Sequence, residues 1–414
     1  MVRTRLISLI CVLCSMVLVP TPVRAGEPQP VVEVTYEQAL ALAREQGPAL
    51  ALARAESVAA EHQVDAARVW RTNPQIRAAA GPRFGADQTQ VDVQVRAQQW
   101  LELGGQRGHR VEAARAELEA SEAREEDAQR RLLRAVSLAF VDALYWRERA
   151  SIAADNLSLA TAAAEVARRR HELGDAGGLE ASSAALAVAH AQLELDQARA
   201  ALGQAEGELA ALLGVEASTP VVAAGDLRSL ALEGEPSEGE PELDARPDLR
   251  ALEAEAREQR SRRALAEAER APDLLVGVGY ALEESEHVAL GIAGLTLPVF
   301  NRGQGEAALA EAREASLEVE LEVARTTAGV AIRTADSLVE QASAAALAFE
   351  RDGLASLERT EEIVTVSYEK GAVAYDEVLV VRLALVAAKL DYADLLRVAA
   401  NARVERAAAR GGLQ

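Results

Sequence analysis

Two glutamates stand at equivalent places in two similar stretches of the chain, HELGDAGGLEAS and YEKGAVAYDEVL. Glu180 follows Gly174 by six residues, and Glu377 follows Gly371 by six, with Asp376 beside it. Carboxylates that meet around a narrow opening attract cations. The alternative is that they are ordinary exposed residues, because acidic side chains stabilise the first turn of a helix. Either role depends on the elements that carry them.

Other residues that could catalyse a reaction or bind a metal are sparse or scattered. No Gly-rich phosphate loop, nucleophile elbow or metal-binding helix motif occurs. No two histidines have i, i+4 spacing, and the five are His62, His109, His171, His190 and His287. The sequence therefore predicts no enzymatic activity, no cofactor and no metal site, with the histidines solvated rather than acting as ligands.

The N-terminal residues 1–25 have the pattern of a secretory signal peptide. Arg3 and Arg5 precede an apolar run of about 14 residues, and small residues stand before Gly26. Because a spanning helix needs roughly 20 apolar residues, this run is too short to be one. Cys14 lies in the middle of the run without small residues just before it, which disfavours lipid attachment.

The chain that remains after cleavage is acidic and contains no sulfur. Both cysteines and both methionines lie in the first 25 residues, so no thiolate or thioether is left to bind a metal. Loss of three arginines and no acidic residue takes the net charge from −21 to −24. This balance argues against nucleic acid and anionic lipid as partners and favours attraction of cations, although it also suits simple solubility.

Long helices are predicted for much of the chain. Residues 106–173 and 304–370 are rich in Ala, Glu, Arg and Leu and contain no proline. At about 1.5 Å per residue each helix would be roughly 100 Å long, too long for a compact globule. Each therefore has to pack along a similar partner, as a coiled coil or an elongated bundle. Gly174 and Gly371 are expected to end them in the left-handed conformation.

Shorter helices are expected beside the long ones. Thr35 and Gln38 form a capping box at the start of the first. Pro48 and Pro247 each fit the first turn of a helix or a kink. The expected shorter helices cover residues 36–70, 179–213, 247–270 and 376–410.

Two stretches alternate between polar and apolar residues with a period of two. They are residues 73–103, with VDVQVRAQ, and residues 272–300, with LLVGVGY and VALGIAGLTL. Each predicts a β-hairpin with two strands of about ten residues, the length of a strand that crosses a membrane obliquely. Trp70 and Trp100 lie at the helical side of the first hairpin, where a membrane-interface anchor and a packing role both fit.

The landmarks of the chain recur at a nearly constant offset. Pro74 and Pro272 lie 198 residues apart, and Gly174 and Gly371 lie 197 apart. We therefore interpret the chain as a duplication of one unit: short helix, hairpin, long helix, glycine turn and returning helix. The predicted parts are a first repeat at 26–213 (strands about 73–103, long helix about 105–173, returning helix about 178–213), an acidic linker or equatorial segment at 214–246, and a second repeat at 247–414 (strands about 272–300, long helix about 304–370, returning helix about 374–411).

Four strands in one chain are too few to close a barrel. An open sheet in lipid would leave unpaired edges, each group costing several kilocalories per mole. The strands are therefore expected to close with strands from other copies. Three chains would give a barrel of 12 strands. Two chains would give the minimal barrel of eight strands, in which side chains fill the interior.

At this point the chain resembles the TolC-like outer-membrane efflux proteins, over essentially its whole mature length. The resemblance rests on VTYEQALALAREQGPAL, the hairpin start NPQI, the hairpin exit LPVFNRGQ, the turn YEKGAVAYDEVLVVRLAL and the duplication. It implies a mainly α fold with transmembrane β: a homotrimer with a shared 12-stranded β-barrel in outer-membrane lipid and a long antiparallel α-helical periplasmic tunnel. The tip would dock on a periplasmic adaptor, or membrane fusion protein, fed by an inner-membrane pump of a Gram-negative bacterium.

The exit of the first hairpin, LELGGQRGHR, is similar to the heavy-metal cation branch of that family. This branch works with pumps of the resistance-nodulation-division (RND) type. The likeness implies cations as cargo, although organic compounds and secreted polypeptides stay open. A conduit of this kind has no need of a tight metal site of its own.

The resemblance also implies roles for the two glycine turns, which would lie at the periplasmic tip. Glu180 and Glu377 match acidic positions at the entrance, and Asp376 is adjacent to Glu377. Val373 and Val380 replace a basic and an acidic position of a salt-bridged lock, so Tyr368 and apolar contacts are expected to hold the tip. The turn residues that match grooves for adaptor tips are Gly174, Ala176, Gly371 and Val373.

The competing interpretation is an extended coiled-coil protein of the periplasm, either a scaffold or the adaptor itself. An adaptor would need a β-rich lipoyl-like region and usually has a single helical hairpin. This chain has two helical hairpins and two pairs of strands. The channel is therefore the favoured interpretation.

Overall fold

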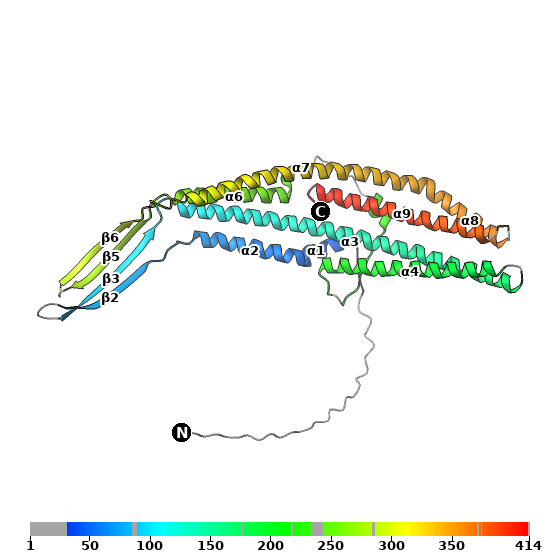
Figure 1. The fold of residues 1–414 in the computed structure, drawn as a ribbon, viewed down its shortest axis with the longest axis horizontal. Helices are drawn as coiled ribbons and strands as arrows, with labels where there is room; N and C mark the ends of the chain where they lie inside the picture. Colours follow the sequence, from blue (N-terminus) through cyan, green and yellow to red (C-terminus); the bar gives the residue numbers. More distant parts are fainter. Residues whose placement is uncertain are drawn as a thin grey trace, which may run out of the picture.

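The computed structural model describes residues 31–84, 89–174, 177–216, 218–233, 243–283, 286–370, 372–373 and 375–412. The molecule is a long rod with a β-sheet at one end, from which helices run to the opposite end (Figure 1). Among the helices in these ranges, none combines the length and the apolar character of a membrane span. The predicted signal peptide lies outside the described residues.

Helices make up most of the described chain. The α-helices are α1 (Tyr36–Gln46), α2 (Pro48–Arg68), α3 (Gln106–Glu172), α4 (Gly178–Leu213), α5 (Leu227–Leu232), α6 (Pro247–Ala268), α7 (Gln304–Phe349), α8 (Ala355–Glu369) and α9 (Tyr375–Ala409). A 3₁₀ turn (η1, Leu243–Ala245) precedes α6, and a π-helical turn (η2, Glu350–Leu354) separates α7 from α8.

The helix starts follow from local sequence signals. Thr35 accepts a hydrogen bond from the backbone of Gln38 while the Gln38 side chain accepts one from the backbone of Thr35, which is the predicted capping box. Pro48 and Pro247 occupy first turns. The predicted helix at 36–70 is divided in two at Gly47. A Cβ there would lie 2.4 Å from the Ala43 carbonyl oxygen and from a Leu132 methyl group, so only glycine allows α1 to pack this closely on α3.

The second long helix differs from the prediction. The sequence predicts one helix over 304–370, but the π-helical turn η2 interrupts it. Gly353 explains the break: it has low helix propensity, and a Cβ on it would lie 3.1 Å from the Phe349 ring. That ring in turn stacks on Tyr392 of α9, with centroids 5.7 Å apart. The packing of Phe349 therefore takes precedence over a regular helix.

The strands form a four-stranded antiparallel sheet at one end of the rod. Its order is β2 (Gln75–Phe84), β3 (Thr89–Leu101), β5 (Leu274–Glu283) and β6 (Glu286–Leu295). The two predicted hairpins thus lie side by side, joined by pairing of β3 with β5. Strands β2 and β6 are the edges.

A second, two-stranded sheet lies near the middle of the molecule. Strand β1 (Val32–Val34) pairs in parallel with β4 (Val221–Ala223). The sequence did not predict this sheet, because three residues are too few to show an alternation. This pairing joins the start of the predicted first repeat to the segment that connects the two repeats.

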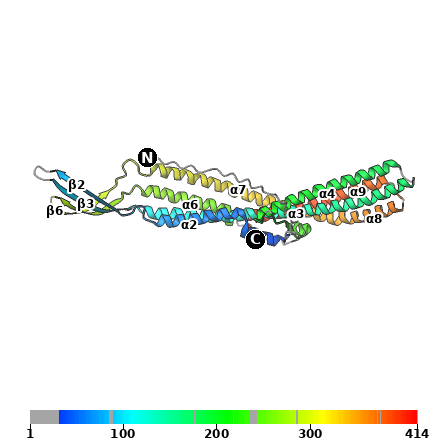
Figure 2. The ribbon, with the colours of Figure 1, turned by 90° about the horizontal axis from the view of Figure 1, so that it is seen from below.

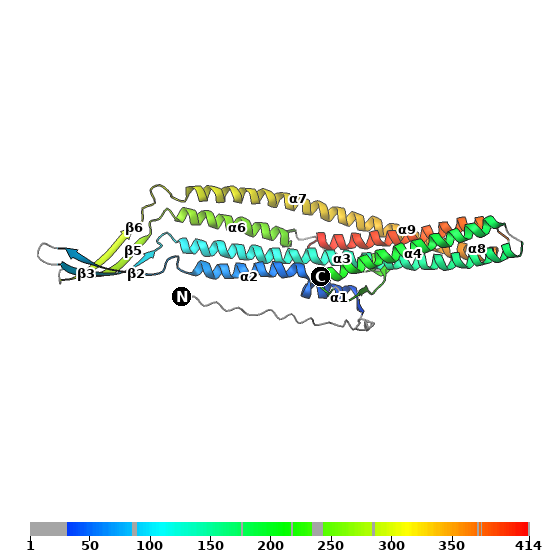
Figure 3. The ribbon, with the colours of Figure 1, turned by 60° about the horizontal axis from the view of Figure 1, so that its bottom comes forward.

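Four helices form a single curved layer between the sheet and the middle of the rod. Helices α2, α3, α6 and α7 lie next to one another in that order, as Figure 3 shows. Beyond the middle, α3 with α4 and α8 with α9 form two antiparallel pairs that extend to the far end (Figure 2). The interleaved Glu and Arg residues join neighbours in the layer, as in the Arg124–Glu255 pair at 2.8 Å and the Arg260–Glu314 pair at 2.8 Å.

The main hydrophobic core lies at the middle of α3. Phe140 is fully buried there, and the ring of Tyr36 packs edge-on against it at 5.6 Å. Leu144 of α3 and Leu209 of α4 belong to the same cluster. Elsewhere alanine dominates the helix contacts, which allows the axes to approach closely.

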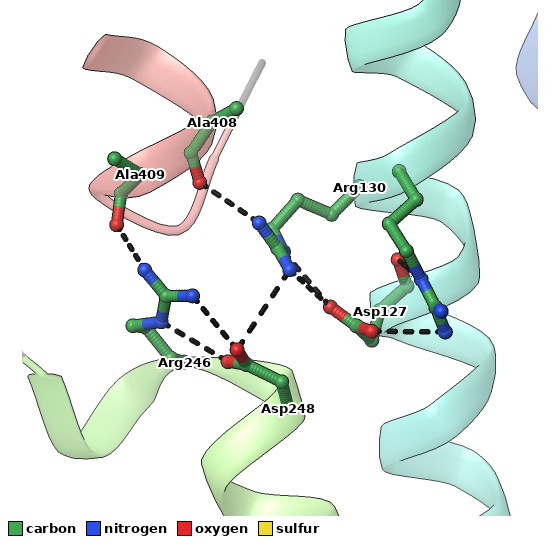
Figure 4. A network of polar contacts seen from close by, with 7 residues as sticks. Asp127, Arg130, Arg246, Asp248, Ala408 and Ala409 are labelled. Atoms are coloured by element: carbon green, nitrogen blue, oxygen red, sulfur yellow. Dashed lines mark hydrogen bonds and ion pairs between the residues drawn. The ribbon is translucent and has the colours of Figure 1, made fainter. Parts of the chain in front are cut away.

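A junction of buried charges near this core joins the start of α6 and the C-terminal end of α9 to the body of α3 (Figure 4). Arg246, just before α6, binds both carboxylate oxygens of Asp248, at 3.0 and 2.7 Å, and donates to the carbonyl of Ala409. Arg130 of α3 donates to the carbonyl of Ala408 at 3.1 Å and to Asp127. Both arginines therefore satisfy carbonyls at the negative C-terminus of α9.

Candidate functional site

The sheet has two chemically different faces. Residues that pair directly across strands share a face, so the register assigns every side chain. One face, which we call the apolar face, carries Ile76, Phe84, Val91, Val93, Val95, Val276, Val278, Tyr280, Leu282 and Leu295. It is well exposed, for example 67% at Val278 and 63% at Val91. Such a surface is suited to contact with lipid.

The opposite face, which we call the polar face, carries the charged residues of the sheet: Arg77, Arg83, Asp92, Arg96, Glu283 and Glu286. Its other members on β5 and β6 are small or apolar, among them Gly279 and Leu290. Near the free end of the sheet, Arg83 forms ion pairs with Asp92 at 2.7 Å and Glu283 at 3.6 Å. Along β3 and β5 the side chains of the polar face are less exposed than those of the apolar face. We therefore infer that the polar face is the inner, concave face of the curved sheet.

The two tryptophans predicted beside the first hairpin lie where the sheet meets the helices. Trp70 follows α2, is 53% exposed and lies under the guanidinium of Arg107 at 5.9 Å. Trp100 pairs with Leu275, and the alternation of β3 places it on the polar face, half-buried. The register therefore favours the packing role for Trp100, whereas Trp70 keeps the exposure that an interface anchor needs.

At the opposite end, α3 and α4 meet in the first glycine turn. Gly174 has a φ of +81°, the left-handed conformation predicted for it. Glu180 lies in the first turn of α4, and its carboxylate accepts from Arg170 of α3 at 2.9 Å. This ion pair closes the helical hairpin. The sequence did not predict it, because Arg170 lies among three other basic residues whose directions the spacing cannot separate.

The second glycine turn is described in part. Glu377 lies in α9 and is exposed, and no described side chain forms an ion pair with it. Val373 is half-buried. The predicted residues that lie outside the described parts are Ala176, Gly371 and the side chains of Tyr368 and Asp376. Among the described residues, Glu180 is thus in an ion pair, whereas Glu377 is exposed to solvent without one.

The two helical hairpins of the chain touch each other close to these turns. Val378 of α9 is 1% exposed, and Leu379 packs against Ala163, Ala167 and Ala184 of α3 and α4. Small residues on one hairpin thus receive branched residues from the other, so an apolar contact holds the hairpins together next to the turns.

A groove runs between the two helical hairpins, on the side of this contact that faces the middle of the rod. It has a volume of about 490 Å³ and is lined mainly by apolar side chains, including Leu186 of α4 and Leu383 of α9. These two leucines are 71% and 59% exposed. Exposed leucines in such a hollow offer a surface to another helix.

Several charged side chains line a second hollow, of about 430 Å³, in the four-helix layer near the sheet. It is lined by residues from all four helices, among them Glu117, Glu258, Arg262, Glu306 and Arg313. Within the described residues no group of three or more His, Cys, Asp or Glu side chains is arranged to hold a metal ion. The hollow therefore presents mixed charge along a wall.

The π-helical turn is clasped by polar contacts. Arg228 of α5 donates to Glu350 at 2.9 Å, and the hydroxyl of Tyr392 donates to the same carboxylate at 3.1 Å. Burial, followed by the bond to Glu350, raises the pKa of Tyr392 to about 12. The hydrogen bond from Arg228 holds the pKa of Glu350 below its usual range. We call Arg228, Glu350 and Tyr392 the π-turn clasp.

Comparison with known proteins shows which family this chain resembles. Residues 39–215 match the model of the outer membrane efflux protein family. The resemblance to the outer membrane efflux proteins is therefore confirmed. The cobalt-zinc-cadmium resistance protein CzcC of Cupriavidus metallidurans is 26% identical over 370 residues, which cover 88% of this chain and 86% of that protein.

Two further proteins are similar to this chain. The nickel-cobalt-cadmium resistance protein NccC of Alcaligenes xylosoxydans xylosoxydans is 28% identical over 338 residues, covering 80% of this chain and 75% of NccC. The solved structure of CusC, reported in a study of its folding and transmembrane channel formation, shares 21% identity. It superimposes with a TM-score of 0.76 over 91% of this chain and 92% of its own. The rod of sheet and helices thus has the same fold as CusC.

Proposed function

We propose that this protein is the outer-membrane channel of a tripartite efflux system, which carries heavy-metal cations from a periplasmic adaptor and an RND-type inner-membrane pump to the exterior. The observation that carries the proposal is the sheet with one apolar and one charged face, continuous with helices of which α3 is roughly 100 Å long. A charged face turned toward lipid would cost about 2–4 kcal/mol for each arginine at the bilayer midplane. The charged face therefore belongs inside a barrel.

The two edges of the sheet support a trimer. Strands β2 and β6 are both edges, and the alternating directions of the four strands let β6 of one chain pair antiparallel with β2 of the next. Three chains close a 12-stranded barrel, whose radius is roughly 12 Å for strands about 4.8 Å apart and tilted about 40°. A barrel of this width leaves a water-filled lumen. Trp70 would then anchor the barrel at the periplasmic interface.

The helices continue the barrel as a tunnel. The layer of α2, α3, α6 and α7 would close with two further copies into a ring of twelve helices, in keeping with the predicted duplication of one unit. The mixed charges of the 430 Å³ hollow keep such a wall wet and unable to bind a passing cation tightly. Weak contact is what a conduit needs, because tight binding slows release.

Heavy-metal cations are proposed as cargo because both curated relatives are named for resistance to such metals. The acidic composition of the chain is compatible with a cation conduit. Organic compounds remain the second candidate. Growth of a strain that lacks its own outer-membrane component, supplied with this protein and its matching pump and adaptor, tests the choice: restored resistance to cobalt, zinc or cadmium supports it, and restored resistance to organic compounds alone refutes it.

The turns at the far end are proposed as the tip that meets the adaptor. Gly174, Ala176, Gly371 and Val373 would form the contact turns, and the 490 Å³ groove lined by Leu186 and Leu383 would receive an apolar helix of the adaptor. Glu377 and Asp376, with Glu180 balanced by Arg170, would ring the entrance, and Tyr368 would help to hold it. The alternative function, a periplasmic scaffold or adaptor without a barrel, leaves the exposed apolar face of the sheet without a use.

A further inference from the structure

Two arginines lie directly opposite each other on the polar face of the sheet. Arg77 of β2 pairs with Arg96 of β3 in the antiparallel register, and Arg96 pairs in turn with Gly279 of β5. A Cβ on Gly279 would lie 3.4 Å from Cγ of Arg96, so the arginine stem rests over the bare glycine backbone. Both arginines are exposed on this face.

Neither arginine has an acidic partner among the described residues. Arg77 donates to the amide oxygen of Gln75 at 3.1 Å, and Arg96 donates to that of Gln94 at 3.1 Å. Like charges directly opposite each other in a sheet destabilise it unless something compensates them. In this they differ from Arg83, which has Asp92 and Glu283 beside it. A positive charge of two per chain therefore faces the inside of the curve.

The surroundings limit how this charge is balanced. The same level of the sheet continues as Gly279 and Leu290, which offer no acceptor side chain. The acidic residues Asp92, Glu283 and Glu286 lie nearer the free end of the sheet, four or more residues farther along their strands than this pair. Balance is therefore left to mobile anions from solution.

We propose that Arg77 and Arg96 form a basic belt inside the barrel, which attracts small inorganic anions and opposes the passage of cations that lack an accompanying anion. The inference rests on the proposed trimeric barrel, in which threefold symmetry brings three such arginine pairs, six guanidinium groups, to one height. A guanidinium group binds an oxyanion by two parallel charge-assisted hydrogen bonds. The belt lies on the helical side of the acidic group formed by Asp92, Glu283 and Glu286.

The test is the ion selectivity of single channels in planar bilayers. Wild-type trimers and the R77Q/R96Q variant are compared by their reversal potential in a potassium chloride gradient. Removal of six charges about 10 Å from the pore axis is expected to raise the permeability ratio of potassium to chloride at least about threefold in 0.1 M salt, and by less in 1 M salt, where the Debye length falls to about 3 Å. The R77K/R96K variant keeps the charges and is expected to keep the wild-type ratio.

Each outcome bears on one part of the inference. A ratio that stays within experimental error in R77Q/R96Q overturns the belt while leaving the channel in place. Wild-type protein that forms no ion-conducting channel overturns the proposed function and the belt together. The single substitution R77Q removes half of the charge and should give an intermediate ratio, so it decides the question if the double variant fails to insert.

Discussion

The junction in Figure 4 permits a prediction whose size follows from the contacts. Replacing Arg246 by Met keeps most of the apolar stem but removes the bonds to Asp248 and to the carbonyl of Ala409. Arg246 is only 7% exposed, and loss of one partner of a buried charge pair costs about 3–5 kcal/mol. The side chain of Asp248 is 30% exposed and Arg130 lies 3.8 Å away, so water and a second cation reduce the expected loss to about 2 kcal/mol.

The assay is thermal unfolding of the detergent-extracted protein, followed by helical circular dichroism. Because the unfolding entropy grows with chain length, a loss of about 2 kcal/mol in this 414-residue chain is expected to lower the midpoint by about 2–3 °C. Replacing Arg68 by Met is the matched control, because its pair with Asp65 is exposed on both sides and a surface pair contributes about 0–1 kcal/mol. Equal midpoints for the Arg246 and Arg68 variants would refute the claim that the junction holds the ends of α6 and α9 against α3.

The same junction should respond to acid. Burial alone would raise the pKa of Asp248, but hydrogen bonding and the charges of Arg246 and Arg130 lower it below its usual value. A carboxyl with a lowered folded-state pKa contributes stability above its unfolded pKa of about 3.9, and this contribution is lost as the pH falls through the folded value. The midpoint difference between wild type and the Arg246 variant should therefore shrink below about pH 4.

Other predictions concern the tip and the π-turn clasp. Replacing both Glu180 and Glu377 by Gln should lower the cation preference of single channels; unchanged selectivity would remove the case for an acidic ring. Replacing Gly371 by Trp should abolish efflux complementation while trimers and membrane insertion persist, and loss of trimers would instead make it a folding position. Because the raised pKa of Tyr392 is about 12, its bond to Glu350 should be complete below pH 10 and lost toward pH 12. Absorbance titration should then show one late-titrating tyrosine fewer in the Tyr392→Phe variant than in the wild type.

The sequence predicted the regular parts of the fold because their signals are long. Helix α3 repeats strong helix formers over 67 residues, and the alternation VDVQVRAQ marks β3 with its charged and apolar faces. Thr35 and Gln38 form the predicted cap because both partners lie within one turn. Signals of this kind depend only on neighbours in the chain.

The features that the sequence did not predict depend on contacts between distant residues. The π-helical turn requires Phe349 to pack on Tyr392, 43 residues away along the chain. The face of Trp100 depends on the register of β3 rather than on the residue type. The Arg77–Arg96 pair appears only when β2 and β3 are aligned, because the two residues are separated by a turn in the sequence. Long-range packing and strand register therefore determine the features that the sequence pattern does not predict.

The central claim is that three chains share one membrane barrel. The most direct test is the mass of the mature protein extracted from outer membranes, measured by light scattering with correction for bound detergent. The account predicts a heat-labile trimer of about three times the chain mass that stays in solution only with detergent. A monomer or dimer that is soluble without detergent and wholly helical by circular dichroism would contradict it and favour the coiled-coil scaffold.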